Sequence, residues 1–496
     1  MTEPTAETTT GKVRGRAHGA LAVFKGIPYA REPFGRDRFQ APREPERWDG
    51  TREADAFGPR PPQSGLEFGM PSWTPDEGLD CLSVNVWTPD AGGSGLPVMV
   101  WLYGGAYMSG YSGQPDYDGA RLAGAGVVVV TFNYRVGMEG FGELAGAPSN
   151  RALLDQVAAL RWVRDNVAAF GGDPGRVTVF GESAGAGSIA ALLAMPSARG
   201  LFRRAIAQSV PGTYYSPGLA RRMSAGIAAE LSLPASAEAL AGTPPEDFFA
   251  AADAFGRRIR DDYAAWGPVA ATGMPYSPVV DGEVLPVTPW QAVADGAARD
   301  VELIVGFNRD EYRLFMVMGS RYGTLSEGDL SAAMEALAPP GAEKEYRAAH
   351  PGAGVDDLYA LVCSDWLFRM PSAHLATAHA EAGGTTHAYE LTWKSPAASD
   401  VLGACHGLDV PLTFGNLDAG IALMLCGDPV PAEAAVLSDG IRNAWTSFAT
   451  TGDPGWPAYR EDTALTRLLD VEPTDVADPE AVSRRIWAAH RFDPME

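Results

Sequence analysis

The sequence predicts an α/β protein in which helices cover a mostly parallel central sheet. Two observations support this prediction. Short continuous apolar runs, typical of strands buried on both faces, occupy residues 98–103, 127–132, 177–180 and 303–307. Between the second and third of these runs, apolar residues recur at helical spacing, so the local order is strand, helix, strand. Connections of this kind are right-handed crossovers, which build parallel sheets.

The first hundred residues follow a different pattern. Short alternating runs, such as 21–24 and 82–87, are separated by turn residues. Alternation of this kind is typical of half-buried strands that are joined as hairpins. We therefore expect antiparallel hairpins before the parallel sheet begins.

The helix between the second and third apolar runs is predicted over residues 153–170. Its apolar positions share one helical face: Leu153, Leu154, Val157, Leu160, Val163 and Val167. Gly171-Gly172 ends the helix. Segments 225–233, 330–337 and 434–448 are predicted as further helices, over the faces of the sheet or around its ligand-binding edge.

The length of 496 residues suggests about three domains at roughly 150 residues per domain, although large α/β folds often form one unit. No low-complexity tract, long charge run or Pro/Gly-rich linker divides the chain. We therefore expect a single domain over residues 1–496.

The charge balance excludes several kinds of partner. The chain has 39 basic and 62 acidic side chains, a net charge of −23, which repels phosphate backbones and anionic lipids. No apolar run approaches the ~18 residues that a membrane-spanning helix needs. We therefore expect neither a nucleic-acid nor a membrane partner, and the sequence leaves the oligomeric state open.

Two further features indicate a cytoplasmic protein. Residues 1–15 are rich in Thr and Glu and lack the apolar segment of a secretory signal. The four cysteines are widely spaced and fit neither a disulfide framework nor a paired C-x-x-C zinc site: Cys81, Cys363, Cys405 and Cys426. We expect free thiols and no metal.

A nucleophile candidate lies after the third apolar run. Gly181-Glu182-Ser183-Ala184-Gly185 matches G-x-S-x-G, the turn that lifts a serine on a bend between a strand and a helix. An Ala/Leu-rich helical stretch, 186–195, follows it as this motif requires. Ser183 is therefore the candidate nucleophile, and the alternative is a Gly-rich loop with a bystander serine.

A dinucleotide-binding reading competes at the same place. Residues 185–190 satisfy the relaxed fingerprint G-x-G-x-x-G/A after a strand. That fingerprint requires an acidic residue about 20 positions further on, to bind a ribose hydroxyl. Residues 207–211 contain no carboxylate, which disfavours a nucleotide cofactor.

A serine nucleophile needs a histidine base and an acid, which follow it in the order acid, histidine on the α/β-hydrolase scaffold. His406 is the first candidate base, because glycines on both sides can present it on a loop at 403–407. His387, within the predicted strand 386–393, is the second. Asp310 and Glu311 both follow the strand 303–307, and spacing alone does not choose between them.

The oxyanion of the reaction needs preorganised N–H donors. Tyr103-Gly104-Gly105-Ala106-Tyr107 follows the first apolar run, where this architecture places its second oxyanion loop. We expect the N–H groups of Gly105, Ala106 and Ala184 to form the oxyanion hole. The alternative is that the glycine pair only makes a turn.

The sequence resembles the type-B carboxylesterase family, which includes bacterial para-nitrobenzyl esterases, animal carboxylesterases and cholinesterases. The matching segments cover nearly the whole chain: FKGIPYA (24–30), DCLSVNV (80–86), NYR (133–135), FGGDPGRVTVFGESAGAG (170–187), GDP (452–454) and WP (456–457).

This resemblance implies an α/β-hydrolase fold with helical insertions around the active site. It makes Glu311 the acid and 403–407 the histidine loop, and it implies that Ser209 and Asp365 are polar residues near the triad. Pro61 stands where disulfide-bearing relatives have a cysteine, so Cys81 lacks its usual partner, in agreement with a reducing compartment.

The function expected from this reading is that of a serine carboxylesterase. Ser183 attacks a small-molecule ester, His406 transfers the protons, Glu311 orients the histidine, and no cofactor or metal takes part. One alternative is the same chemistry on amides, carbamates or lipids. Another is a catalytically silent interaction protein on the same fold.

Overall fold

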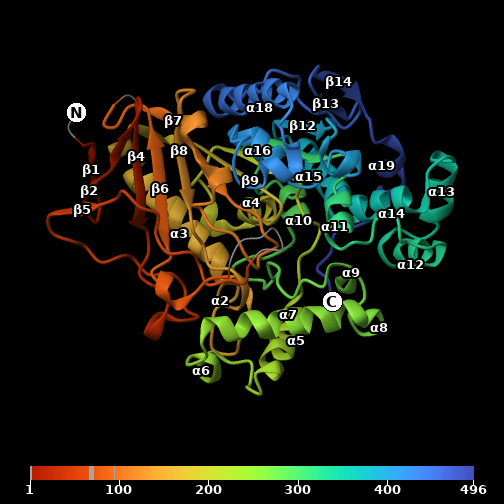
Figure 1. Cartoon of the computed structure of the whole chain (residues 1–496), viewed down its shortest axis with the longest axis horizontal. Coiled ribbons are helices and arrows are strands. Elements are labelled where there is room, and N and C mark those ends of the chain that lie inside the picture. Colours follow the sequence, from red (N-terminus) through yellow and green to blue (C-terminus); the bar gives the residue numbers. More distant parts are fainter. Residues whose placement is uncertain (1–2, 66–71, 94) are drawn as a thin grey trace.

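The computed structural model describes residues 3–65, 72–93 and 95–496. Its large sheet contains β3 (Arg16–His18), β4 (Leu21–Pro28), β6 (Ser83–Thr88), β7 (Leu96–Leu102), β8 (Val128–Phe132), β9 (Gly172–Glu182), β10 (Arg204–Gln208), β11 (Glu302–Asn308), β12 (Thr386–Leu391), β13 (Leu465–Leu469) and β14 (Thr474–Ala477). Among the described residues the strand order is β14-β13-β12-β11-β10-β9-β7-β8-β6-β4-β3 (Figure 1). A small second sheet contains β1 (Thr5–Thr8), β2 (Gly11–Arg14) and β5 (Thr51–Glu53).

The centre of the large sheet is parallel and its two edges are antiparallel. From β8 through β7, β9, β10, β11 and β12 to β13, every neighbouring pair is parallel. The pairs β6–β8, β4–β6, β3–β4 and β13–β14 are antiparallel. The predicted mostly parallel sheet, its four apolar strands and the antiparallel N-terminal pairs are therefore confirmed.

Helices surround this sheet. Their bounds are α1 (Ala120–Ala123), α2 (Gly137–Phe141), α3 (Arg151–Asn166), α4 (Ala184–Ala194), α5 (Pro217–Glu230), α6 (Ala237–Leu240), α7 (Pro245–Asp261), α8 (Tyr263–Trp266), α9 (Val269–Thr272), α10 (Pro289–Ala294), α11 (Arg313–Met318), α12 (Glu327–Leu337), α13 (Ala342–Ala349), α14 (Val355–Ser364), α15 (Met370–Glu381), α16 (Asp409–Phe414), α17 (Ala422–Cys426), α18 (Ala432–Thr451) and α19 (Ala481–Trp487). Within the described ranges, no helix is long and apolar enough to cross a membrane.

Two helical layers enclose the parallel strands. On β9, the ring of Phe180 packs against Phe414 of α16, with centroids 5.6 Å apart. The next residue, Gly181, faces the backbone of Gly185 in α4. Because successive strand residues point to opposite faces, α16 and α4 lie on opposite sides of the sheet. This layering confirms the predicted fold class.

Two predicted helices differ from the observed ones at their ends. The predicted helix 153–170 consists of α3 followed by a 3-10 turn, Val167–Phe170, which ends at Gly171 with φ 84°. The predicted helix 225–233 is part of α5, which begins earlier because the Ser216 side chain accepts the Leu219 N–H and Pro217 occupies the first turn. The spacing of apolar residues contains no information about this N-cap, so it could not predict where α5 begins.

The helical insertions enter the chain after two neighbouring strands. Helices α5 to α10 lie between β10 and β11 in sequence, and α11 to α15 lie between β11 and β12. Both insertions therefore leave the sheet at the carboxyl ends of its strands, the edge where parallel α/β sheets bind ligands. Figure 1 shows α5 to α8 in green below the sheet and α12 to α14 beside it.

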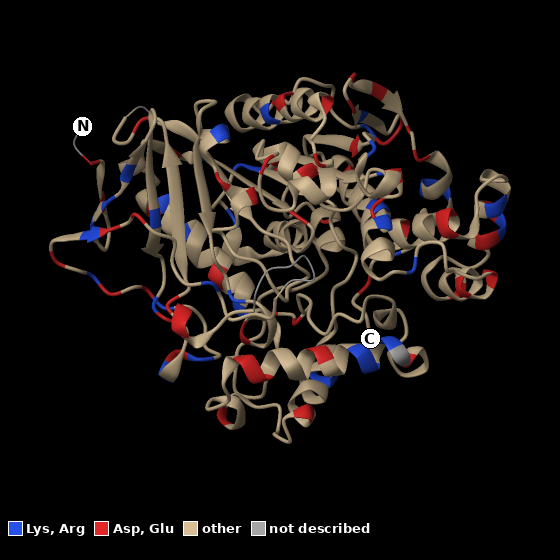
Figure 2. Ribbon diagram, in the orientation of Figure 1, with Lys and Arg blue, Asp and Glu red and all other residues tan. Residues whose placement is uncertain are grey.

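Charged residues of both signs lie on the outside of the fold, although acidic side chains outnumber basic ones, 62 to 39. Figure 2 shows acidic and basic residues intermingled on the outer helices and loops, while the strands of the large sheet are mostly neutral. A single domain over residues 1–496 remains a prediction, and residues 1–2, 66–71 and 94 lie outside the described part of the chain.

Candidate active site

Ser183 lies on the turn between β9 and α4. Its backbone adopts φ 56° and ψ −123°, a strained conformation for a residue with a side chain. The flanking glycines allow the turn, because a Cβ on Gly181 would lie 2.6 Å from the Leu102 carbonyl oxygen and one on Gly185 would collide with the same oxygen. The G-x-S-x-G spacing therefore reflects a close approach of this turn to the end of β7.

A hydrogen-bonded chain of three side chains begins at this serine. His406 Nε2 lies 2.9 Å from Ser183 Oγ, and His406 Nδ1 lies 2.5 Å from Glu311 Oε2. Glu311 is fully buried, and His406 is 6% exposed. The structure therefore brings together the three residues that the sequence analysis proposed as nucleophile, base and acid.

The carboxylate of Glu311 is held by further donors. Its Oε1 accepts hydrogen bonds from the Asn308 N–H (2.8 Å) and from Ser209 Oγ (2.5 Å), which leaves Oε2 for His406. Because both oxygens are engaged, the carboxylate has little freedom to turn. Ser209 therefore contacts the carboxylate of Glu311 directly.

Asp310 and His387 occupy other positions. Asp310 Oδ2 accepts a hydrogen bond from the Ala404 N–H at 3.0 Å. This carboxylate therefore stabilises the histidine loop and is not part of the hydrogen-bonded series Ser183, His406, Glu311. His387 is buried in β12 between the rings of Phe448 and Trp456. Of the open alternatives, only Glu311 and His406 lie in line with Ser183.

A second buried carboxylate faces the same histidine. Glu182 Oε1 lies 3.1 Å from His406 Nε2, on the side that also contacts Ser183. Sequence reasoning overlooked Glu182, although its place directly before the serine, at the end of a buried strand, was a readable signal.

These charges act on each other in a buried environment. Burial lowers the pKa of His406, but the carboxylates of Glu182 and Glu311 outweigh that effect and raise this pKa to about 9. Burial raises the pKa of Glu182 to about 8, against the attraction of His406. The two carboxylates therefore favour the charged imidazolium of His406, whereas burial favours the protonated, neutral form of Glu182.

Two aromatic rings cover the imidazole. Phe368 stacks on His406 with centroids 4.2 Å apart and an interplanar angle of 24°. Phe315 lies at 5.2 Å. These apolar contacts restrict the ring to the plane in which it meets both Ser183 and Glu311.

A further carboxylate, Asp409, lies behind the histidine loop at the start of α16. It accepts hydrogen bonds from Gln208 Nε2 (2.8 Å), the Tyr389 hydroxyl (2.9 Å) and Asn308 Nδ2 (3.3 Å). Burial raises its pKa. Asp409 ties the histidine loop to β10, β11 and β12, a long-range role that no local pattern indicates.

Within the described residues, Asp365 makes no hydrogen bond or ion pair with the three aligned side chains. It belongs to a π-helical turn, Asp365–Arg369, and accepts a 2.6 Å hydrogen bond from the Tyr346 hydroxyl. Arg369 lies 3.3 Å from its other oxygen. Phe368 of this turn, rather than Asp365, contacts His406.

The oxyanion loop lies beside the serine. A Cβ on Gly104 would be 3.1 Å from Ser183 Cβ, and the next residues have φ angles of 114° (Gly105) and 53° (Ala106). Within the described part of the chain, the N–H groups of Gly105 and Ala106 donate to no other group. Ala184 opens α4, so its N–H also lacks a partner four residues back in the helix.

A strained serine turn, with its base and acid on the following loops of a parallel sheet, is the arrangement by which α/β-hydrolases hold a nucleophile. Comparison with known proteins agrees. The model of the carboxylesterase family matches residues 2–477. The chain is 39% identical to a para-nitrobenzyl esterase of Bacillus subtilis (strain 168) over 98% of each sequence. It is 34% identical to a phenmedipham hydrolase of Pseudarthrobacter oxydans, over 96% of this chain and 97% of the relative.

Solved structures give the same result. A PNB esterase superposes with a TM-score of 0.84 at 37% identity and covers 98% of this chain and 99% of its own. A carboxylesterase of Geobacillus stearothermophilus superposes with a TM-score of 0.85 at 35% identity, over 97% and 99%. The chain belongs to the carboxylesterase family. It has the α/β-hydrolase fold and is a carboxylic ester hydrolase.

Proposed function

We propose that Ser183, His406 and Glu311 are the catalytic triad of this serine carboxylesterase. The observation that supports the proposal is the buried chain of hydrogen bonds from Ser183 Oγ through His406 to Glu311 Oε2. A serine hydroxyl becomes an effective nucleophile only when a base removes its proton as it attacks. Glu311 holds Nδ1 protonated, so that Nε2 is free to accept that proton.

The reaction proceeds through an acyl-enzyme. Ser183 Oγ attacks the ester carbonyl carbon while its proton passes to His406 Nε2. The tetrahedral intermediate then releases the alcohol, which takes this proton. Water, deprotonated by His406, attacks the acyl-enzyme in the same way and restores Ser183. The cycle uses side chains, backbone N–H groups and water, so it requires no cofactor.

The oxyanion is stabilised by the N–H groups of Gly105, Ala106 and Ala184. Their free donors and the close approach of Gly104 to Ser183 support this assignment. Ala184 also lies at the N-terminus of α4, where the helix dipole favours negative charge. One preorganised donor of this kind contributes about 3–4 kcal/mol to a transition state.

Replacing single triad residues tests the assignment. Hydrolysis of p-nitrophenyl acetate by Ser183→Ala should fall at least 10³-fold while the melting temperature stays near that of the wild type. Glu311→Gln should lose most of its turnover. The matched variant Asp310→Asn should lose much less, and an inverted order would refute Glu311 as the acid.

We also propose that the substrates are small-molecule carboxylic esters and that the protein acts in the cytoplasm. The localisation is supported by the cysteines Cys81, Cys363, Cys405 and Cys426, which are all buried free thiols. Reducing compartments keep thiols in this form.

A further inference from the structure

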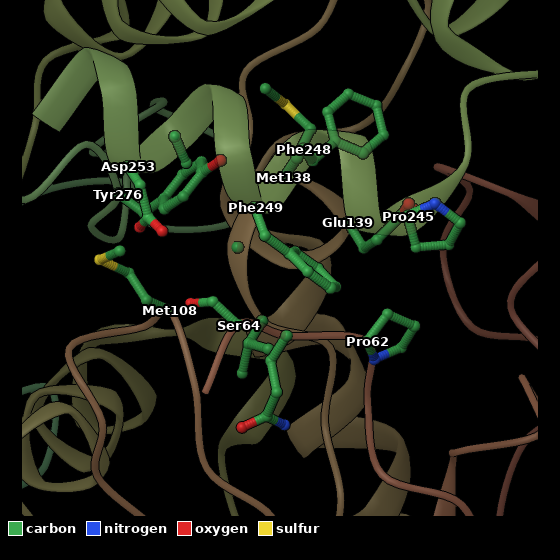
Figure 3. Close-up of a pocket in the computed structure, with 14 residues that line it drawn as sticks. Pro62, Ser64, Met108, Met138, Glu139, Pro245, Phe248, Phe249, Asp253 and Tyr276 are labelled. Atoms are coloured by element: carbon green, nitrogen blue, oxygen red, sulfur yellow. The ribbon is translucent and has the colours of Figure 1, made fainter. Parts of the chain in front are cut away.

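A small cavity lies beside the oxyanion loop, between α2 and α7 (Figure 3). Its volume of about 30 Å³ accommodates one or two water-sized groups. Its wall includes Met108, Glu139, Phe248, Phe249, Asp253 and Tyr276. We call it the Glu139 cavity, and no triad residue lines it.

Glu139, which lines the cavity, has one acceptor oxygen without a donor among the described residues. The residue is 4% exposed, and both Nε and Nη2 of Arg38 donate to its Oε1, at 3.0 and 2.6 Å. Its Oε2 is buried and has no hydrogen-bond partner within the described residues. Figure 3 shows the Glu139 side chain directed toward Pro245, across the gap between α2 and the start of α7.

The neighbouring arginines already have other acceptors. Arg38 Nη1 donates to the carbonyl oxygens of Ala241 and Thr243. The three guanidinium nitrogens of Arg151 donate to backbone carbonyls, including that of Glu139 itself. A buried carboxylate oxygen without a donor is unfavourable, so an occupant that supplies an N–H would be stabilised there.

The rest of the wall selects the kind of donor. Asp253 adds a second carboxylate at the mouth, where the residue is exposed. Phe248, Phe249 and Tyr276 provide rings, and Met108 contributes an apolar side chain. Aromatic faces and a carboxylate oxygen without a donor both favour a cationic donor. Arg38 is paired with Glu139, and Arg257 and Arg260 act on Asp253, so the attraction comes from the unpaired oxygen and the rings rather than from a net negative charge. A hydrocarbon chain that ends in an ammonium group can pack its methylene groups against the apolar side chains and donate its N–H groups to the carboxylate oxygen.

We propose that the Glu139 cavity binds the alkylammonium end of an ester substrate, so that this esterase prefers esters with a positively charged amine. The inference rests on the proposed function, because the same bound ester must react with Ser183.

The cavity borders the loop that carries the proposed oxyanion donors. Met108 is two residues beyond Ala106, so their Cα atoms are at most about 7 Å apart. Gln63, another wall residue, holds the same loop through two hydrogen bonds with the backbone of Gly110, of 2.7 and 2.9 Å. An occupant of the cavity therefore contacts the segment that carries the oxyanion donors.

Pairs of esters that differ only in charge test the proposal. One series carries the amine in the acyl part: p-nitrophenyl 4-aminobutanoate, 6-aminohexanoate and 8-aminooctanoate, each against the alkanoate with a methyl group in place of the ammonium. A second series carries it in the alcohol, as acetates of amino alcohols against n-alkyl acetates. The proposal predicts a kcat/KM ratio, amine over neutral, of roughly tenfold or more at one chain length in one series.

Two variants connect this preference to the cavity. Glu139→Gln should bring the ratio close to one. Asp253→Asn should reduce it severalfold, and because Asp253 is exposed it provides the test if Glu139→Gln does not fold. The matched control is Asp247→Asn, also exposed on α7 but outside the cavity wall, and it should keep the wild-type ratio.

The outcomes distinguish a failure of the proposed cation subsite from a failure of the proposed esterase activity. Wild-type turnover of the neutral esters without preference for any amine ester would overturn the cation subsite and leave the proposed esterase intact. A preference that survives both Glu139→Gln and Asp253→Asn would also overturn it. If the enzyme hydrolyses none of the esters in either series, the proposed function itself is refuted.

Discussion

At the scale of single residues, the distinctive feature of this site is that His406 faces two carboxylates. Glu311 contacts Nδ1, and Glu182 contacts Nε2 together with Ser183. The base must be neutral to accept the serine proton, but the transition state contains an imidazolium. Glu182 therefore stabilises the charged form and raises the pH at which the base becomes available.

Removing this second carboxylate should shift the pH dependence of the reaction. The pKa of His406 is raised to about 9, so kcat/KM should fall as the pH drops through a value above the ordinary histidine range. In Glu182→Gln that pKa decreases, and the acidic limb should move to lower pH by about one unit or more. The measurement is the pH profile of kcat/KM for a p-nitrophenyl ester. An acidic limb at the same pH in both proteins would contradict the role of Glu182.

The ring of Phe368 positions the imidazole. Phe368→Ala removes the stacked partner, so His406 should lose its fixed plane and kcat should fall by about ten- to a hundredfold with little change in KM. Phe448→Ala, which removes a buried ring beside His387 instead, should destabilise the protein but leave kcat within a few-fold of wild type. Equal losses of kcat in the two variants would show that Phe368 acts only through stability.

At the scale of elements, the turn between β9 and α4 depends on glycines that no other residue can replace. Gly185→Ala places a methyl group against the Leu102 carbonyl oxygen at the end of β7. We expect it to lower both the melting temperature and the turnover. Gly218→Ala, near the start of α5, has 3.6 Å to the nearest atom and should leave both unchanged. Wild-type behaviour of Gly185→Ala would disprove the close approach.

A buried ion pair holds helix α3 to the segment that follows β8. Arg135 and Asp155 are joined by side-chain hydrogen bonds of 2.7 and 2.8 Å, and both side chains are fully buried. Asp155→Ala should destabilise the protein by about 3–5 kcal/mol, because it leaves a buried charge without a partner. Asp165→Ala breaks an exposed pair on the same helix and should cost less than about 1 kcal/mol. Urea unfolding compares the two, and equal losses would contradict this reading.

The elements also show how far sequence reasoning reaches. The buried strands and the turn at Ser183 could be predicted because local apolar runs and glycine spacing report them. The start of α5 was missed, since it depends on the cap at Ser216 rather than on apolar period. Asp409 was missed because its importance arises from contacts across the fold, whereas Glu182 was missed although its place directly before the serine could be read from the sequence. Asp365, which the resemblance implies to be a polar residue near the triad, contacts Tyr346 and Arg369, and no local pattern indicates these partners.

At the scale of the whole molecule, the described fold brings residues 183, 311 and 406 to one edge of a single sheet. This explains why a chain long enough for three domains shows no linker. The insertions at that edge also contribute to both features around it: α7 forms one wall of the Glu139 cavity, and Phe315 of α11 and Phe368 cover His406.

The state of the cysteines is a property of the whole chain and can be counted. All four are buried, and burial raises the pKa of each thiol. The native protein should therefore react slowly with a thiol reagent, and four thiols should react per chain after unfolding in denaturant without reductant. A count of two would reveal a disulfide and contradict the proposed cytoplasmic location.

The central claim is that Ser183 forms the covalent intermediate. The most direct measurement is to treat the protein with a fluorophosphonate, digest it and locate the adduct by mass spectrometry. The account predicts one adduct per chain, on Ser183 within the peptide that contains Gly181 to Gly185, and none in Ser183→Ala. An adduct on another residue, or labelling that persists in Ser183→Ala, would contradict it.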